Sequence, residues 1–285
     1  MPNQIMKSKR LHRPTFLLGV GAQKSGTTWL ANQLERHPQF MMSPIKELHY
    51  WDRRFHADFF PGVGRSKRII KQLKEGRSVG EFMRGPKVEQ FLMDRDELYY
   101  KTYFETRLLE NHHSFGEFSP SYCILTHSEF QHIRSFMQPY QTRALFLMRD
   151  PVSRIWSQCV MEYVKATNRG KKYDPYEAFE CKFKEPAIFK RGDYKTTIQN
   201  LDLAFPESDR RYVFFEELFK QQTLQKLCDF IGIDMINFDV ASNPNVGRSL
   251  DKPSTNSWNR VRDEMAPIYD FVAKKMGYLP EEWGS

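Results

Sequence analysis

The sequence predicts an α/β fold, in which a parallel β-sheet is flanked by helices on both faces. Three observations support this prediction. Short, continuously apolar runs at residues 15–20, 144–148 and 212–215 are typical of strands buried on both faces of a parallel sheet. Each run is followed by helical periodicity, and alternating strands and helices favour parallel order with right-handed crossovers. A glycine-containing turn joins the first run to its helix, which is the setting that a phosphate-binding loop requires.

The first strand–turn–helix unit contains an incomplete nucleotide-triphosphate loop. The pattern G-x-x-x-x-G-K-[ST] is satisfied by Gly21, Gly26 and Thr28, but Thr27 stands where the lysine belongs. The only lysine is Lys24, three places earlier. The helix is expected to run from Thr27 until Pro38 ends it. The loop is therefore P-loop-like without being a triphosphate loop.

The position of Lys24 indicates the kind of phosphate compound that this loop holds. Backbone N–H groups and the helix N-terminus bind phosphate oxygens, and the hydroxyls of Ser25, Thr27 and Thr28 add donors. A lysine at the standard position serves the β- and γ-phosphates, and the adjacent hydroxyl binds magnesium. Because Lys24 is set back, it is expected to reach the first groups attached at the 5′ end. We expect a shorter donor, bound without a metal.

Two further units follow the same plan. The run 144–148 leads to Arg149-Asp150-Pro151, where Asp150 is a good N-cap and Pro151 suits the first helical position, so a helix is predicted through about Val164. The run 212–215 precedes a helix around 224–231, and residues 115–118 are a further candidate strand. Ligands of parallel sheets bind beyond the carboxyl ends of the strands. The loops at 21–26 and 149–157 are therefore expected to face one crevice.

The remaining segments are assigned to one domain that covers residues 1–285. Residues 53–110, with a helix near 95–108, are interpreted as an insertion that shapes an acceptor pocket. Residues 241–257 are expected to form a long loop that covers the nucleotide, before a final helix at about 263–276. Long ordered loops in compact domains are often functional.

Composition restricts the function classes. The chain has 43 basic and 35 acidic residues, a net charge of +8, which suits an anionic ligand or partner surface. Its four cysteines lie far apart without C-x-x-C spacing, so neither a metal site nor a disulfide framework is expected. We find no signal-peptide core in the first 13 residues and no apolar run of 18 residues. The expectation is a complete cytoplasmic chain without a transmembrane segment.

Two motifs resemble the sulfotransferases that use 3′-phosphoadenosine 5′-phosphosulfate (PAPS). "QKSGTTWL" (23–30) is similar to the 5′-phosphosulfate loop of that family, which implies donor contacts from Lys24 to Trp29: Lys24, Ser25, Gly26, Thr27, Thr28 and Trp29. "RDPVSRIWSQ" (149–158) is similar to the 3′-phosphate element, in which Arg149 and Ser157 would hold the 3′-phosphate. Weaker similarities at 191–201 and 246–249 imply nucleotide contacts from Tyr194, Gly247 and Arg248. "GEFSPSY" (116–122) and "FFEEL" (214–218) are also similar.

The segment "KELHYWD" (46–52) resembles the acidic-x-histidine segment of glycan O-sulfotransferases. The resemblance implies that Glu47 is the general base, with His49 and Asp52 as shapers of its basicity or as substrate contacts. Lys24 would stabilise the charge that develops on the leaving phosphate oxygen. The chain departs from the pattern at Phe118, where some glycan sulfotransferases carry a lysine, so acceptor contacts made there do not transfer.

The resemblance implies transfer of a sulfuryl group to a hydroxyl or amine of a small molecule, glycan or lipid, without a metal. Nucleic acid is not the expected partner, and oligomeric state stays open. The alternatives are a nucleotide kinase with a degenerate loop, which would need magnesium and ATP, and a basic nucleic-acid-binding module. Structural roles are also open: a polar strand end for Glu47, an ion pair for Arg149, a neutral helix position for Ser157, core packing for Trp29 and an exposed loop for Gly247 and Arg248.

Overall fold

A single parallel sheet of five strands forms the centre of the computed structural model, which describes residues 13–57, 74–75, 86–181, 183–241 and 250–284. All pairings are parallel and the strand order is β2-β3-β1-β4-β5. The strands are β1 (Thr15–Gly21), β2 (Phe40–Met42), β3 (Ser114–Phe118), β4 (Thr142–Met148) and β5 (Arg210–Phe214). The predicted fold class and the four predicted strands are confirmed. The strand β2 was not predicted, because three residues are too short for a recognisable apolar run.

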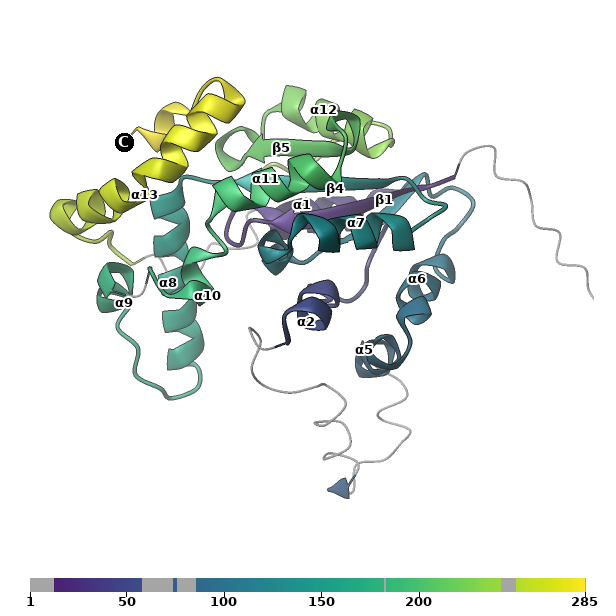
Figure 1. Ribbon diagram of the computed structural model, residues 1–285, viewed down its shortest axis with the longest axis horizontal. Coiled ribbons are helices and arrows are strands. Elements are labelled where there is room, and N and C mark those ends of the chain that lie inside the picture. The colour runs from purple at the N-terminus through teal and green to yellow at the C-terminus, as the bar shows by residue number, and fades with distance from the viewer. Residues whose placement is uncertain (1–12, 58–73, 76–85, 182, 242–249, 285) are drawn as a thin grey trace, which may run out of the picture.

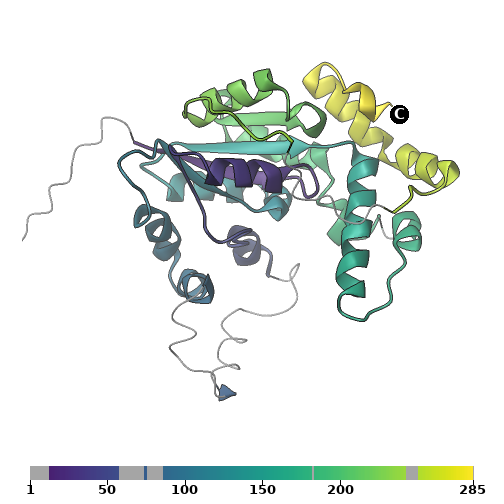
Figure 2. The same cartoon turned by 180° about the vertical axis from the view of Figure 1, so that it is seen from behind.

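Helices cover both faces of the sheet, as the alternation of side chains along β1 requires. Phe16 and Leu18 pack with α6 (Glu97–Glu105), α7 (His127–Phe136), α11 (Tyr194–Ala204) and α13 (Thr255–Met276). Leu17 faces the opposite side and packs with α1 (Thr27–Glu35) and α12 (Gln221–Ile231). Figure 1 is seen from the side of α7 and α11, and Figure 2 from the side of α1. The two apolar clusters together bury β1 completely, and β4 except at Arg143.

The long helix α8 (Pro151–Thr167) begins where the sequence predicts it and leaves the end of β4 across the strand direction (Figure 1). The Asp150 carboxylate accepts a hydrogen bond from the Ser153 N–H at 2.7 Å, and Pro151 occupies the first turn. Asp150 is also held from outside the helix: its N–H donates to Glu216 at 3.1 Å, and Tyr269 of α13 donates to its carboxylate. The start of α8 is therefore fixed by three separate elements.

The predicted loop at 241–257 is wrong at its end. Helix α13 starts at Thr255 instead of about residue 263, because Ser254 is an N-cap that accepts a hydrogen bond from the Ser257 N–H at 3.2 Å. Pro267 lies inside this helix. Residues 242–249, with Gly247 and Arg248, lie outside the described residues.

The helix predicted near 95–108 is present as α6, and a further helix before it, α5, was not predicted. Asp96 ends α5 (Pro86–Arg95) and caps α6, since its carboxylate accepts a hydrogen bond from the Leu98 N–H at 2.9 Å. Helix α2 (Trp51–Phe55) packs on α6, where the Trp51 and Tyr100 rings lie 5.0 Å apart. The other described helical elements are η2 (Pro120–Ile124), α9 (Pro175–Cys181), α10 (Pro186–Phe189), η3 (Glu207–Asp209), η4 (Phe215–Glu217) and η5 (Glu281–Trp283).

Gly116→Ala should destabilise the sheet. Gly116 pairs with Leu17 across β3 and β1, and a Cβ at this position would lie 2.1 Å from the Leu17 carbonyl oxygen. Overpacking of this kind costs about 1–3 kcal/mol or more, because the two strand backbones must separate. Denaturant unfolding measures the loss. Gly170→Ala is the control for backbone strain alone, since nothing lies within 4 Å of its Cβ position but its φ is 66°. A loss at Gly116 that is no larger than the loss at Gly170 would contradict the close packing.

Candidate active site

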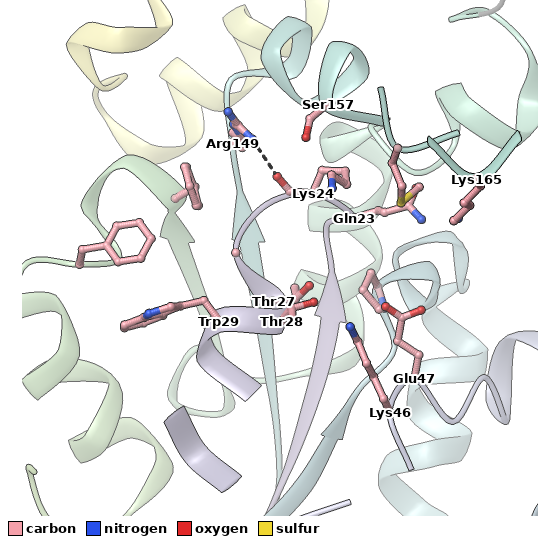
Figure 3. A pocket seen from close by; sticks show the side chains of 15 residues that line it. Gln23, Lys24, Thr27, Thr28, Trp29, Lys46, Glu47, Arg149, Ser157 and Lys165 are labelled. Atoms are coloured by element: carbon pink, nitrogen blue, oxygen red, sulfur yellow. Dashed lines mark hydrogen bonds between the residues drawn. The ribbon is translucent and has the colours of Figure 1, made fainter. Parts of the chain in front are cut away.

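A pocket of about 640 Å³ lies beyond the carboxyl ends of β1 and β4 (Figure 3). It brings together Lys24 from the turn after β1, Glu47 from the segment after β2, and Arg149 and Ser157 from the start of α8. The sequence predicted that the two loops share one crevice, and the structure shows it. The complete lining is Gln23, Lys24, Gly26, Thr27, Thr28, Trp29, Lys46, Glu47, Pro120, Arg149, Ser157, Met161, Lys165, Phe215 and Phe219.

The turn after β1 has the backbone form of an anion-binding loop. Lys24 and Gly26 both have positive φ, 70° and 85°. Helix α1 begins at Gly26 without a side-chain cap and without an acidic residue in its first turn. The amide groups at a helix start need partners, and the positive end of the helix dipole favours an anion. The loop therefore offers backbone donors and the Lys24 ammonium to one ligand.

Arg149 is positioned through both its backbone and its side chain. The Tyr194 hydroxyl accepts from the Arg149 N–H at 3.3 Å and donates to the Arg149 carbonyl at 2.8 Å. The guanidinium donates to the Lys24 carbonyl at 3.4 Å, drawn as the dashed line in Figure 3, and lies 4.8 Å from the centre of the Phe215 ring. The loop of β1 and the start of α8 are thus in direct contact, with the guanidinium between them.

One face of α8 borders the pocket over two turns. Ser157, Met161 and Lys165 are spaced by four residues and all line the cavity. Residues four apart lie one above the other on a helix, and eight residues rise by about 12 Å. Ser157 therefore lies near the Arg149 end of the cavity, and Lys165 lies near its other end, across from Glu47 (Figure 3).

Glu47 reaches the pocket with His49 and Asp52 behind it. His49 Nε2 is 3.3 Å from Glu47 Oε2, and His49 Nδ1 is 2.6 Å from Asp52 Oδ2. Ser121 bonds to both His49 and Asp52. Asp52 is fully buried, while Glu47 is half-buried and lines the cavity. The arrangement is a carboxylate that faces the pocket, an imidazole that orients it, and a buried carboxylate that orients the imidazole.

A buried hub on β3 holds this segment in place. Glu117 is fully buried and accepts hydrogen bonds from Tyr100, Tyr122 and Ser119 at 2.5, 2.9 and 2.7 Å. In turn, Ser119 Oγ accepts from the His49 N–H at 3.1 Å, and the Tyr122 hydroxyl accepts from the Tyr50 N–H. These bonds reach the residues that follow Glu47. They fix the backbone where Glu47 and His49 have positive φ, 49° and 50°.

The charges of the three residues are coupled. Burial opposes the charged imidazole, but hydrogen bonds to Asp52 and Glu47 raise the pKa of His49 to about 9. The His49 hydrogen bond is the largest cause that lowers the pKa of Glu47. Burial is the largest single influence on Asp52 and raises its pKa, but the hydrogen bond and charge of His49, with the hydrogen bonds from Ser121 and the Arg53 N–H, together lower the pKa. Near neutral pH the group is a cationic imidazole between two carboxylates.

Lys24 lies in a cationic field. Its pKa is lowered, first by burial and then by Arg149, Lys165 and Lys46, while Glu47 acts in the opposite direction. Like charges held together in one cavity favour the binding of an anion, which relieves their repulsion. The pocket is thus suited to a polyanionic ligand.

Some predicted site residues lie outside the pocket lining. Tyr194 and Ser25 are fully buried, and the Tyr194 hydroxyl is bonded to the Arg149 backbone. His49 lies behind Glu47. Trp29 borders the cavity, but it is 3% exposed and its indole donates to the Asp239 carbonyl, so it also packs in the core. Phe118, the departure noted in the sequence, is buried in the cluster on the α1 side.

The site residues predicted from the sequence do not include the hub Glu117 or seven residues of the pocket lining: Gln23, Lys46, Pro120, Met161, Lys165, Phe215 and Phe219. Lys46 and Phe215 stand in motifs that were recognised, but no role was assigned to them. The four-residue spacing of Ser157, Met161 and Lys165 was the available signal for Lys165. No described residue of the predicted 53–110 insertion lines the pocket.

The described residues contain no group of three or more His, Cys, Asp or Glu side chains that could hold a metal ion. Over the same residues, no helix has the length and apolar character needed to cross a membrane.

Comparison with known proteins identifies the family. Residues 14–237 match the model of the sulfotransferase family. Among solved structures, the sulfotransferase from Alicyclobacillus acidocaldarius is 20% identical, with a TM-score of 0.63, over 96% of this chain and 100% of that one. The sulfotransferase domain of the curacin biosynthetic pathway is 15% identical, with a TM-score of 0.47, over 94% and 100% of the two chains. No curated protein sequence gives a significant match.

The family model and the fold define an α/β transferase. Since the family model spans most of the sequence, the chain belongs to the sulfotransferase family, and it is a sulfotransferase whose acceptor is unidentified. The similarity to the A. acidocaldarius enzyme, at 20% identity, supports the shared fold.

The charged imidazole of His49 should make stability depend on pH. With a folded pKa of about 9 against an ordinary value of 6.5, its contribution is fully present below pH 6.5 and is lost as pH rises through 9. The difference in free energy of unfolding between the native chain and His49→Gln should therefore shrink over that window, by on the order of 3 kcal/mol. His127→Gln, at an exposed position of α7, is the control. A difference that stays constant or grows between pH 6.5 and 9 would exclude the charged arrangement.

Proposed function

We propose that the protein transfers the sulfuryl group of PAPS to a hydroxyl or amine of its acceptor and releases adenosine 3′,5′-bisphosphate. The observation that carries the proposal is the single pocket in which the Lys24 loop, the Arg149–Ser157 face of α8 and the Glu47 carboxylate meet. The membership of the chain in the sulfotransferase family supports the proposal.

PAPS fits the charge and the shape of the pocket. The loop at 24–28 would hold the 5′-phosphosulfate through its amides and the Lys24 ammonium. Arg149 and Ser157 would hold the 3′-phosphate, with charge-assisted hydrogen bonds worth about 1.5–3 kcal/mol. Phe215, Phe219 and Trp29 supply aromatic surface beside the loop, where a base could stack. Tyr194 contributes by positioning Arg149, and Gly247 and Arg248 stay predictions of the sequence.

The reaction needs alignment and charge neutralisation. Sulfuryl transfer resembles phosphoryl transfer in that it is an in-line displacement through a loose transition state. The acceptor oxygen bonds to sulfur as the bond from sulfur to the 5′-phosphate oxygen breaks. Lys24 stabilises the negative charge that appears on that leaving oxygen. Glu47 takes the proton of the acceptor, since its carboxylate is ionised near neutral pH and faces the cavity.

Nucleotide preference tests the donor assignment. In EDTA, adenosine 3′,5′-bisphosphate should stabilise the native chain against heat far more than ADP or ATP does, because only the bisphosphate reaches both ends of the site. Arg149→Ala should weaken bisphosphate binding by roughly 10- to 100-fold, as measured by calorimetry, through loss of charge-assisted hydrogen bonds. The exposed Arg169→Ala is the control for loss of a cation near α8. Stabilisation by ATP with magnesium, and none by the bisphosphate, would make the protein a kinase-like enzyme instead.

Removing the proposed base should separate turnover from binding. Glu47→Gln should lower the transfer of label from radioactive PAPS to a cell extract by about 10²- to 10⁴-fold. Its affinity for adenosine 3′,5′-bisphosphate should stay within about twofold, because the base acts on the acceptor. Glu35→Gln, exposed on α1, is the matched control. An equal loss of nucleotide affinity would remove Glu47 from the role of base.

A further inference from the structure

The pocket holds more positive charge than the donor contacts use. Four cations line it, Lys24, Lys46, Arg149 and Lys165, against one carboxylate, Glu47. Under the proposed function, Lys24 and Arg149 serve the two ends of the donor. Lys46 and Lys165 are left over, and both lie at the Glu47 end of the cavity (Figure 3).

The length of α8 separates these two lysines from the 3′-phosphate end. Lys165 lies eight residues beyond Ser157 on the same helix face, which is a rise of about 12 Å. Lys46 is the residue before Glu47 and comes from the opposite wall. The carboxylate that would receive the proton is thus bracketed by an ammonium from each side. Both lysines are close enough to Glu47 to act on its carboxylate electrostatically.

Neither lysine has a strong partner. Among the described residues Lys46 forms no ion pair, and it is exposed. Lys165 pairs with Glu162 at 3.0 Å, but the two side chains are 49% and 40% exposed. Exposed pairs between neighbouring helical residues contribute little to stability, so Lys165 can turn to a ligand at little cost.

The positive charges of the two lysines make Glu47 a weaker base unless a bound anion neutralises them. Lys46 and Lys165 lower the pKa of Glu47, although the His49 hydrogen bond is the larger cause. A general base accepts a proton best when its pKa lies near the working pH, so added cations weaken it. A negative group on the acceptor would neutralise this effect. The acceptor would then gain binding energy and restore the basicity of Glu47 together.

We propose that Lys46 and Lys165 form an anion subsite, and that the acceptor carries a carboxylate, phosphate or sulfate group close to the hydroxyl or amine that is sulfated. This inference rests on the proposed function, because it assumes that acceptor chemistry takes place at Glu47. It assigns a substrate class to a pocket whose acceptor is otherwise unspecified.

The experiment uses the full chain, radioactive PAPS and a clarified detergent extract of cells of the organism from which the protein comes. The extract is separated beforehand on an anion exchanger into a flow-through and a retained fraction. We expect label to enter acceptors of the retained fraction. Phosphatase treatment of that fraction should abolish labelling if the group is a phosphate, amidation of carboxyls should abolish it if the group is a carboxylate, and sulfatase treatment should abolish it if the group is a sulfate. Labelling that survives all three treatments would overturn the proposal.

Variants test the two lysines directly. Lys46→Gln and Lys165→Gln should each lower kcat/KM for the retained fraction by roughly tenfold, the loss of one charge-assisted contact at a partly exposed site. Their affinity for adenosine 3′,5′-bisphosphate should stay within about twofold. The exposed Lys172→Gln, beyond the end of α8, is the control and should behave as the native chain.

The outcomes are distinct. Labelling confined to the flow-through, or unchanged kcat/KM in both variants, would overturn the anion subsite. A loss of bisphosphate affinity equal to the loss of turnover would also overturn it, since the lysines would then serve the donor. Failure of the native chain to bind the bisphosphate at all would instead refute the proposed function.

Discussion

The parallel pairing of β1 with β4 is the constraint on which the site depends. Because both strands run in the same direction in adjacent positions, the loops that follow them leave the same edge of the sheet. The Ala22 N–H donates to the Leu147 carbonyl at 2.6 Å, and the Arg149 guanidinium donates to the Lys24 carbonyl. Two short loops, 125 positions apart in the chain, thereby become one surface with cations at its two ends. A donor with charge at both ends needs cations that are held apart in this way. Packing on both faces of the sheet keeps the two loops rigid.

The acceptor side is built by a different principle. The segment that carries Glu47 has no regular secondary structure, and two of its residues have positive φ, which costs each of them on the order of 1–3 kcal/mol. The buried hydrogen bonds around Glu117, together with Asp52 and Ser121, offset that strain by holding the backbone and the imidazole. The end of the pocket at Lys24 and Arg149 therefore rests on sheet geometry, and the end at Glu47 rests on a polar network beneath it. Loss of the network would be expected to disturb Glu47 before it disturbs nucleotide binding.

Sequence patterns predicted most of the sheet and the two loops that share the pocket, because those features are local. Apolar runs define β1, β3, β4 and β5, and the offset of Lys24 within its loop is visible in eight residues. The helix α5 and the early start of α13 were not predicted, and in α13 a single capping residue, Ser254, decides where the helix begins. The role of Glu117 and the convergence of Lys46 with Lys165 could not be predicted from patterns. Both features depend on which helix faces and which strands are neighbours in the folded protein. The spacing of residues along the sequence does not contain that information.

A crystal structure with adenosine 3′,5′-bisphosphate tests the central claim most directly. The account predicts one nucleotide that spans the pocket, with its 5′-phosphate on the loop at 24–28 within reach of Lys24 and its 3′-phosphate between Arg149 and Ser157. Glu47 should be left free of the nucleotide, facing the space beyond the 5′-phosphate. A nucleotide in the reverse orientation, or bound away from either cation, would contradict the account.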